Sequence, residues 1–183
     1  FIDLMKVRYT AMDGQSALRY SINVTSFGMG GAVAARANRS SKIFGGKAAF
    51  IIATLQTALT FSGNVVTLTL DDSQTIEARV TNVAVGNGQY HGAGMWVCPG
   101  AAIDDGILNL TIIRYLPVWE LVRSLPLLYN GGIYRHPRVE SYGVKRVVAH
   151  SAGPTLIEID GEPLGRLPIE ISVLPGAIRV LLP

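Results

Sequence analysis

The stretch VVTLTLDDSQTIEARVTNVAV, residues 65–85, decides the fold class of this chain. Two runs rich in β-branched residues, 65–70 and 75–85, flank the polar segment Asp71-Asp72-Ser73-Gln74, a connection that favours a hairpin. Between Ile76 and Val80 apolar and charged side chains alternate, as they do in a strand with one buried and one solvated face. The stretch therefore predicts antiparallel β-structure.

Further short strands are expected on both sides of this hairpin. They are predicted at 1–9, 19–25, 95–98, 107–114, 139–150, 155–160, 169–174 and 177–182. Helices are predicted at 32–38, 47–61 and 117–129, and Pro126 should end the last one early. We therefore predict a single α+β domain over residues 1–183 that is predominantly β and forms an antiparallel sandwich-like or barrel-like structure.

The composition indicates a large core or a covered surface. Hydrophobic residues make up 49% of the chain, charged residues only 16%, and the mean hydropathy is +0.32. Soluble domains usually carry about 25% charged residues, so either the core is large or a partner, another domain or a lipid covers part of the surface. The net charge of +3 comes from basic residues scattered without interleaved aromatics, which gives no support to nucleic-acid binding.

Cysteine content and segment lengths exclude several classes of protein. Cys98 is the only cysteine, so the chain has no internal disulfide, which fits a reducing compartment, and no cysteine cluster for zinc. The longest apolar segment, Ala48 to Phe61, is too short to span a bilayer and predicts a buried helix. Because the chain begins at Phe1, without a basic and apolar leader, we expect it to be a piece of a longer polypeptide.

The first candidate site follows an apolar strand at Asn87-Gly88, with more glycines at Gly92 and Gly94. Such glycines permit close approach of a ligand to backbone amides, and the Asn87 side chain can hydrogen-bond a phosphate or a hydroxyl. The alternative is a hairpin turn, since Asn-Gly is its strongest short signal. His91, inside this segment, is interpreted as a polar loop residue.

The second candidate is Asp104-Asp105-Gly106, which precedes a predicted strand. Adjacent carboxylates beside loop carbonyls form an oxygen-rich arrangement of the kind that Mg²⁺ or Ca²⁺ prefers. The alternative is a glycine-containing turn with no ligand.

The third candidate is Asp160-Gly161-Glu162 at the end of a predicted strand. A carboxylate held on such a turn can accept a proton from a hydroxyl that attacks a phosphoryl group. The alternative is a plain Asp-Gly hairpin. Cys98 lies in an apolar run and is predicted to be packed core.

In this order, the motifs resemble the bacterial-type diacylglycerol kinase and sphingosine kinase family of lipid kinases. The resemblance begins at SINVTSFG (21–28), continues through VAVGNGQYHGAGMWVCPGAAIDDGILNL (83–110) and ends at IEIDGEP (157–163), so it covers nearly the whole chain. It implies the β-rich C-terminal domain of a two-domain fold shared with NAD kinases. The Gly-Gly-Asp-Gly-Thr nucleotide motif of the family's N-terminal domain does not occur in this sequence.

The resemblance also implies roles for individual residues. Glu162 would be the proton acceptor, on a turn shaped by Asp160 and Gly161, so that Glu162 and Asp160 are the predicted catalytic residues. The cleft would be lined by Asn87 and Gly88. A structural Mg²⁺ would be bound by the side chain of Asp105 and the carbonyls of Ala102 and Ile107, and ATP would donate the phosphoryl group.

The function expected from this resemblance is ATP-dependent phosphorylation of a hydroxyl on a diacylglycerol-like or sphingoid lipid, with the missing N-terminal domain as a partner. A non-enzymatic lipid- or membrane-binding β-sandwich is the alternative. A kinase of a soluble nucleotide such as NAD is disfavoured because the expected glycine-serine-threonine pattern is absent. We expect a cytoplasmic protein with peripheral membrane contact, and a homodimer is left open.

Overall fold

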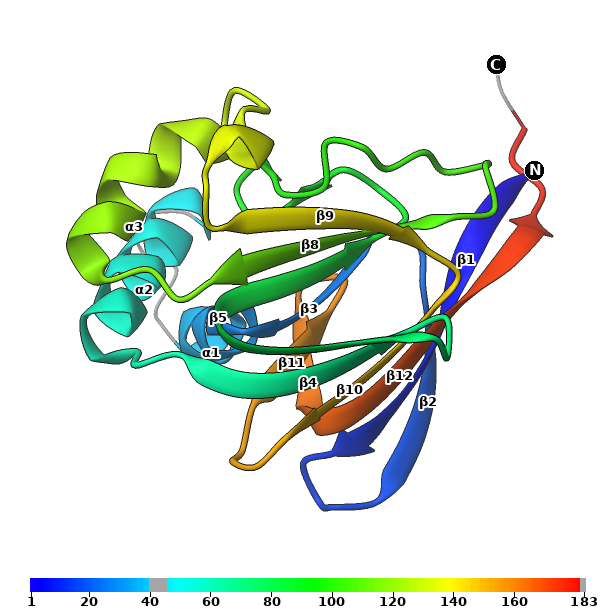
Figure 1. The fold of residues 1–183 in the computed structure, drawn as a ribbon, viewed down its shortest axis with the longest axis horizontal. Helices are drawn as coiled ribbons and strands as arrows, with labels where there is room; N and C mark the ends of the chain where they lie inside the picture. The colour runs from blue at the N-terminus through cyan, green and yellow to red at the C-terminus, as the bar shows by residue number, and fades with distance from the viewer. Residues whose placement is uncertain (40–45, 182–183) are drawn as a thin grey trace.

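The computed structural model describes residues 1–39 and 46–181, and its strands and three helices confirm the predicted mostly-β class (Figure 1). The strands are β1 (Ile2–Ala11), β2 (Ser16–Ser21), β3 (Val24–Gly28), β4 (Asn64–Leu70), β5 (Gln74–Gly86), β6 (Tyr90–His91), β7 (Met95–Trp96), β8 (Leu108–Arg114), β9 (Val139–Val144), β10 (Arg146–Ser151), β11 (Leu156–Ile159) and β12 (Glu162–Ile178). The helices are α1 (Met29–Arg39), α2 (Gly46–Thr60) and α3 (Val118–Ser124), with 3₁₀ turns at Leu125–Leu128 and Ile133–Arg135.

Two long strands, β5 and β12, join two layers of antiparallel strands into a sandwich-like structure. The first part of β5 pairs with β4, whereas its second part lies between β3 and β8, with β9 beyond β8. β12 pairs first with β11 and then with β10, while β1 follows it along most of its length and β2 lies outside β1. Because β10 also pairs with β4, the strands β4, β5, β3, β11, β12 and β10 form a closed ring of paired strands.

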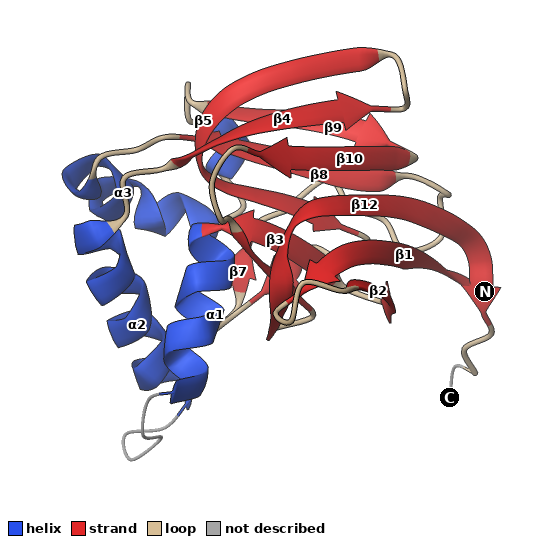
Figure 2. Cartoon of the chain, turned by 90° about the horizontal axis from the view of Figure 1, so that it is seen from below, coloured by secondary structure: helices blue, strands red, loops and turns tan. Residues whose placement is uncertain are grey.

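The main core fills the space between these layers. Inward-facing residues of β4, β5, β8 and β12 form it, among them the fully buried Leu68, Leu110 and Ile171. The helices gather at one side of the strands (Figure 2), where Val33 of α1, Ala53 of α2 and Leu121 of α3 belong to a second cluster. This helix–strand boundary is where the candidate site lies.

The predicted β4–β5 hairpin is confirmed, and its turn also explains an error elsewhere. Asp71 and Asp72 take positive φ angles in this turn, a conformation that Asp tolerates better than most residues. Asp71 Oδ1 accepts hydrogen bonds from the amides of Lys145 and Arg146, at 2.8 and 2.7 Å. The single strand predicted at 139–150 is therefore wrong, since the chain bends at Lys145 and forms β9 and β10.

Other boundaries also differ from the prediction. The strand expected at 19–25 is interrupted at 22–23. The helix expected at 117–129 ends early, as predicted, at Ser124, before the 3₁₀ turn that contains Pro126. The strands expected at 169–174 and 177–182 are one strand up to Ile178, because β1 pairs with β12 on both sides of Pro175-Gly176. Residue 182 lies outside the described residues.

Candidate functional site

The Asp-Gly-Glu motif forms a tight turn between β11 and β12. Asp160 and Gly161 have φ angles of 49° and 85°, and Ile159 pairs with Glu162 across the turn. Positive φ at both central residues is the geometry of the two-residue hairpin turns for which Asp-Gly is a preferred sequence. The predicted hairpin is thus present, and it fixes where the two carboxylates point.

The carboxylate of Asp160 organises the connection between β2 and β3. Its Oδ1 accepts hydrogen bonds from Ser21 Oγ at 2.8 Å and from the amides of Asn23 and Val24, both at 3.1 Å. Its Oδ2 accepts one from the amide of Ile22 at 3.1 Å. Both oxygens are therefore engaged by backbone and hydroxyl donors, which hold the β2–β3 connection and explain the interruption of the strand expected at 19–25.

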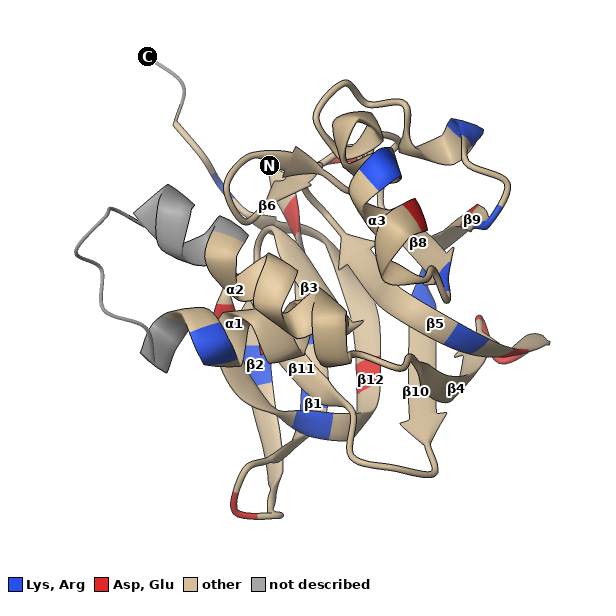
Figure 3. Ribbon diagram, turned by 90° about the vertical axis from the view of Figure 1, so that its left-hand side faces the viewer, with Lys and Arg blue, Asp and Glu red and all other residues tan. Residues whose placement is uncertain are grey.

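Glu162 carries the exposed carboxylate of the turn. Its side chain is 55% exposed, and its Oε2 lies 2.9 Å from Nη2 of Arg19 on β2. Figure 3 shows basic residues on β1 and β2, the strand pair to which Arg19 belongs. An ion pair this exposed contributes little to stability, so the carboxylate of Glu162 remains accessible from solvent.

Glu158, a buried carboxylate that the sequence did not single out, hydrogen-bonds the backbone of this turn. Glu158 is 3% exposed, and its Oε2 accepts a hydrogen bond from the amide of Gly161 at 2.7 Å. Its Oε1 accepts one from Ser26 Oγ at 2.8 Å and lies 3.2 Å from Nδ1 of His91. One carboxylate thus ties together β3, the glycine segment and the Asp-Gly-Glu turn.

His91 is therefore more than the polar loop residue that its sequence context indicated. It belongs to the short β6–β7 hairpin, where it pairs with Met95 and where the rings of Tyr90 and Trp96 stack with centroids 5.2 Å apart. The available sequence signal was Glu158 itself, a charged residue between Ile157 and Ile159 in an apolar strand. Such a residue is rarely buried without a partner.

Asn87 and Gly88 hydrogen-bond the β2–β3 connection, which Asp160 also holds. Asn87 is fully buried, and its Nδ2 donates to the carbonyls of Asp3 and Ile22, both at 3.0 Å. The amides of Asn87 and Gly88 both donate to the carbonyl of Asn23 at 2.9 Å. A Cβ on Gly88 would collide with the Asn23 side chain, which accounts for glycine at this position. In this structure both residues hold the β2–β3 connection from below.

The Asp104-Asp105-Gly106 loop is organised by its own turn and by a second buried acid. Asp105 Oδ1 accepts a hydrogen bond from the amide of Ile107 at 2.9 Å, as in an Asx turn. The carboxylate of Asp3, 2% exposed, accepts hydrogen bonds from the amides of Gly106 and Gly176, both at 2.7 Å. Asp3 therefore fastens this loop to β1 and to the end of β12.

The fit of this loop to a metal rests on few donors. Over residues 1–39 and 46–181 the structure contains no group of three or more His, Cys, Asp or Glu side chains that could hold a metal. One carboxylate oxygen of Asp105 is already engaged by Ile107. A site formed by Asp105 and the carbonyls of Ala102 and Ile107 would need its other ligands from water, so it stays a prediction.

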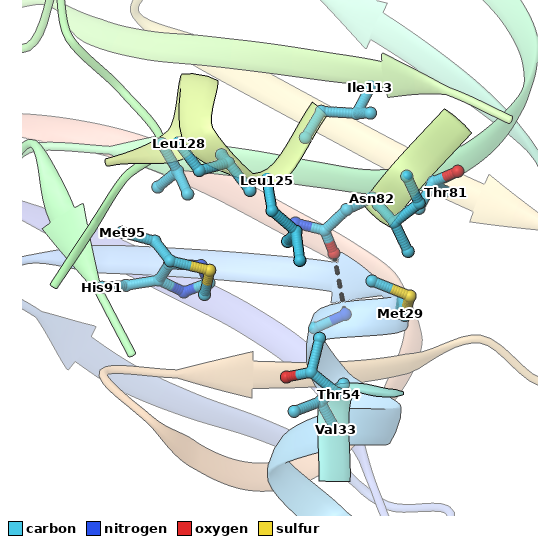
Figure 4. Close-up of a pocket in the computed structure, with 13 residues that line it drawn as sticks. Met29, Val33, Thr54, Thr81, Asn82, His91, Met95, Ile113, Leu125 and Leu128 are labelled. Atoms are coloured by element: carbon cyan, nitrogen blue, oxygen red, sulfur yellow. Dashed lines mark hydrogen bonds between the residues drawn. The ribbon is translucent and has the colours of Figure 1, made fainter. Parts of the chain in front are cut away.

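An apolar cavity of about 50 Å³ lies between α1, α3 and the strands (Figure 4). Its lining includes Met29, Val33, Met95, Ile113, Leu125 and Leu128. Beside it lies a second hollow of about 150 Å³, bordered by Ala34, Gly92, Glu158 and Gly161. Gly30 and His91 border both spaces, so an apolar pocket and a hollow with a carboxylate meet at His91.

The groups whose pKa is displaced lie away from this site. Burial raises the pKa of the Cys98 thiol to about 12. The thiol is packed in the core, as predicted, and is not a nucleophile at neutral pH. The hydrogen bond from Arg114 lowers the pKa of Glu140 on β9. These shifts arise from structural contacts outside the Asp-Gly-Glu turn, which remains the candidate chemical centre because of its accessible carboxylate.

Comparison with known proteins agrees with this description. Residues 23–182 match the family model described as the YegS C-terminal NAD kinase beta sandwich-like domain. The chain is 32% identical over 116 residues to a diacylglycerol kinase of Mycobacterium tuberculosis, a match that covers 63% of this chain and 37% of that protein. It is 30% identical over 184 residues to a Pseudomonas fluorescens protein named as a YegS-like lipid kinase, covering the whole chain and 60% of that protein.

The fold is also that of solved kinases. A crystal structure of a diacylglycerol kinase from Bacillus anthracis superposes with a TM-score of 0.60 at 18% identity, covering 96% of this chain and 51% of that one. The chain belongs to the family of YegS C-terminal, NAD kinase-like β-sandwich domains. The resemblance inferred from the motifs is therefore confirmed, and the relatives are named as lipid kinases. None of the helices described in residues 1–39 and 46–181 is long and apolar enough to cross a membrane.

Proposed function

We propose that this chain is the β-rich domain of an ATP-dependent lipid kinase and that it carries the group that activates the lipid hydroxyl. The observation that carries the proposal is the accessible carboxylate of Glu162, on a turn whose Gly161 borders the hollow at Glu158. A lipid alcohol needs an apolar space for its hydrocarbon chain and a proton acceptor near its reacting hydroxyl.

The residues of this domain would act mainly by positioning. Asp160 and Glu158 hold the backbone of the turn that precedes Glu162 through hydrogen bonds to Ser21, Val24 and Gly161. Glu162 would accept the proton of the hydroxyl as its oxygen attacks the phosphoryl group. Arg19 balances the charge of Glu162 before the substrate binds. The cavity has room for only a few methylene groups, so a longer chain would require side chains of its lining to move.

The nucleotide would be bound by an N-terminal domain of the complete polypeptide, because this chain spans only 37–60% of the relatives described above. Magnesium at the reaction centre would arrive with ATP and neutralise the charge of its phosphates. A separate structural Mg²⁺ at Asp105 would stabilise the 104–106 loop. The lipid would be reached at a membrane surface.

The test is transfer of labelled γ-phosphate from ATP to a panel of lipids by the complete polypeptide. Glu162→Gln should lower kcat at least about 100-fold with an unchanged melting temperature, because a positioned proton acceptor contributes about 10²–10⁴. Glu77→Gln, which alters an exposed carboxylate on β5, is the matched control and should retain full activity. A Glu162→Gln enzyme with the wild-type rate would remove Glu162 from the mechanism.

A lipid-binding module without kinase activity is the second candidate, since the apolar cavity alone would serve it. Vesicle binding without transfer of phosphate to any lipid, by the complete polypeptide with ATP and Mg²⁺ present, would favour this candidate. Transfer of phosphate to NAD instead of a lipid would indicate the nucleotide kinases that share the fold.

A further inference from the structure

The Glu158 carboxylate determines which ring nitrogen of His91 carries a proton and donates a hydrogen bond. A carboxylate can only accept, so the 3.2 Å contact requires the proton on Nδ1 of His91. In the neutral form of the ring, the lone pair is then on Nε2. The other donors to Glu158, Ser26 Oγ and the amide of Gly161, lie at 2.8 and 2.7 Å and hold the carboxylate in one position.

The imidazole of His91 is almost enclosed and borders both the apolar cavity and the hollow at Glu158. The His91 side chain is 11% exposed, and the residues that the structure describes provide no hydrogen bond to its Nε2. Figure 4 shows the ring beside Met95 at the margin of the apolar cavity. On the other side, the hollow at Glu158 is bordered by Gly161, which belongs to the same turn as Glu162. An unpartnered acceptor therefore lies where the chain and the head of an amphiphile would meet.

We propose that His91 Nε2 accepts a hydrogen bond from a second donor on the lipid, a hydroxyl or amine next to the hydroxyl that is phosphorylated. The proposal rests on the proposed lipid kinase function and adds a substrate class to it. An acceptor at this place favours lipids with a second donor over lipids whose neighbouring groups are ester carbonyls, which only accept. Glu158 is the positioning residue because it holds the proton on Nδ1.

The experiment compares a monoacylglycerol that has a free hydroxyl beside the reacting one with its methyl ether at that position. With the complete wild-type polypeptide, the free hydroxyl should raise kcat/KM about five- to tenfold, the effect of one hydrogen bond. His91→Phe should abolish this preference through KM, while the KM for ATP stays unchanged. His150→Phe, which alters an exposed histidine on β10, is the control and should keep the preference.

Glu158→Gln distinguishes positioning from support of the fold. The amide of Gly161 requires the oxygen of the new side chain, so its NH₂ group must face Nδ1 of His91. The proton then moves to Nε2, which becomes a donor, and the preference should reverse toward the methyl ether. The His91 ring ¹⁵N signals report this change of tautomer directly. An unchanged preference together with an altered tautomer would overturn the proposal.

A binding measurement separates this proposal from the kinase function. Without ATP, the monoacylglycerol should shift the Nε2 signal of His91 and its methyl ether should not. If no lipid is phosphorylated but this shift is observed, the His91 site stands and the kinase function fails. If lipids are phosphorylated and neither the shift nor the preference is found, only the role of His91 fails.

Discussion

Replacing Asp160 tests whether the Asp-Gly-Glu turn is built by its own carboxylate. In Asp160→Asn the amide oxygen can still accept from Ser21, Asn23 and Val24, while the NH₂ group faces the amide of Ile22, so one hydrogen bond is lost. A hydrogen bond to a charged group is worth about 1.5–3 kcal/mol. Solvent can replace this exposed one in part, which lowers the expected loss to about 1–2 kcal/mol.

Asp160→Ala removes all four hydrogen bonds and also places alanine at a φ angle of 49°. Because the left-handed conformation alone costs about 1–2 kcal/mol for a residue other than glycine or Asn/Asp, we expect a loss of about 3–5 kcal/mol. Thermal unfolding should show a melting temperature about 2–8 °C lower for the asparagine variant, and at least twice that decrease for alanine. The reasoning is refuted if both variants melt with the wild type, or if asparagine is as damaging as alanine.

Three further outcomes follow from the close packing of Gly31 and from the displaced pKa values of Cys98 and Glu140. Gly31→Ala should unfold the helix–sheet junction, because its Cβ would lie 2.5 Å from the carbonyl carbon of Leu156, and circular dichroism with urea titration would detect the loss. Cys98 keeps its proton in the folded state to about pH 12, so above pH 9.0 the unfolded thiol ionises first. Relative to Cys98→Ala, the protein should then lose up to about 1.4 kcal/mol of stability per pH unit. The lowered pKa of Glu140 contributes stability that is lost as pH falls through its folded value, and Glu140→Gln should flatten the acid limb of a stability–pH curve.

The structural metal predicted at Asp105 has its own test. Asp105→Asn should lower the melting temperature measured with Mg²⁺ present and should remove any stabilisation that added Mg²⁺ gives the wild type. If magnesium titrations of the two proteins coincide, the 104–106 loop is only a turn.

Local patterns in the sequence predicted the parts of the fold that local interactions determine. The β4–β5 hairpin and the Asp-Gly turn follow from alternation and from residues that tolerate positive φ, and both are present. The breaks at 22–23 and at Lys145 were missed because carboxylates far away in the chain, Asp160 and Asp71, hold them. The partnership of Glu158 with His91 was missed for the same reason, since 67 positions separate them.

The hydrogen bonds of Asp160 also have a consequence for the order of folding. They join positions that are 136–139 residues apart, and the Asp3–Gly176 contact spans 173. Contacts this distant in the chain form late and slow the folding of a domain. During translation, the β2–β3 connection therefore cannot form its hydrogen bonds to Asp160 until β11 has been synthesised. The site can assemble only when translation of the domain is nearly complete.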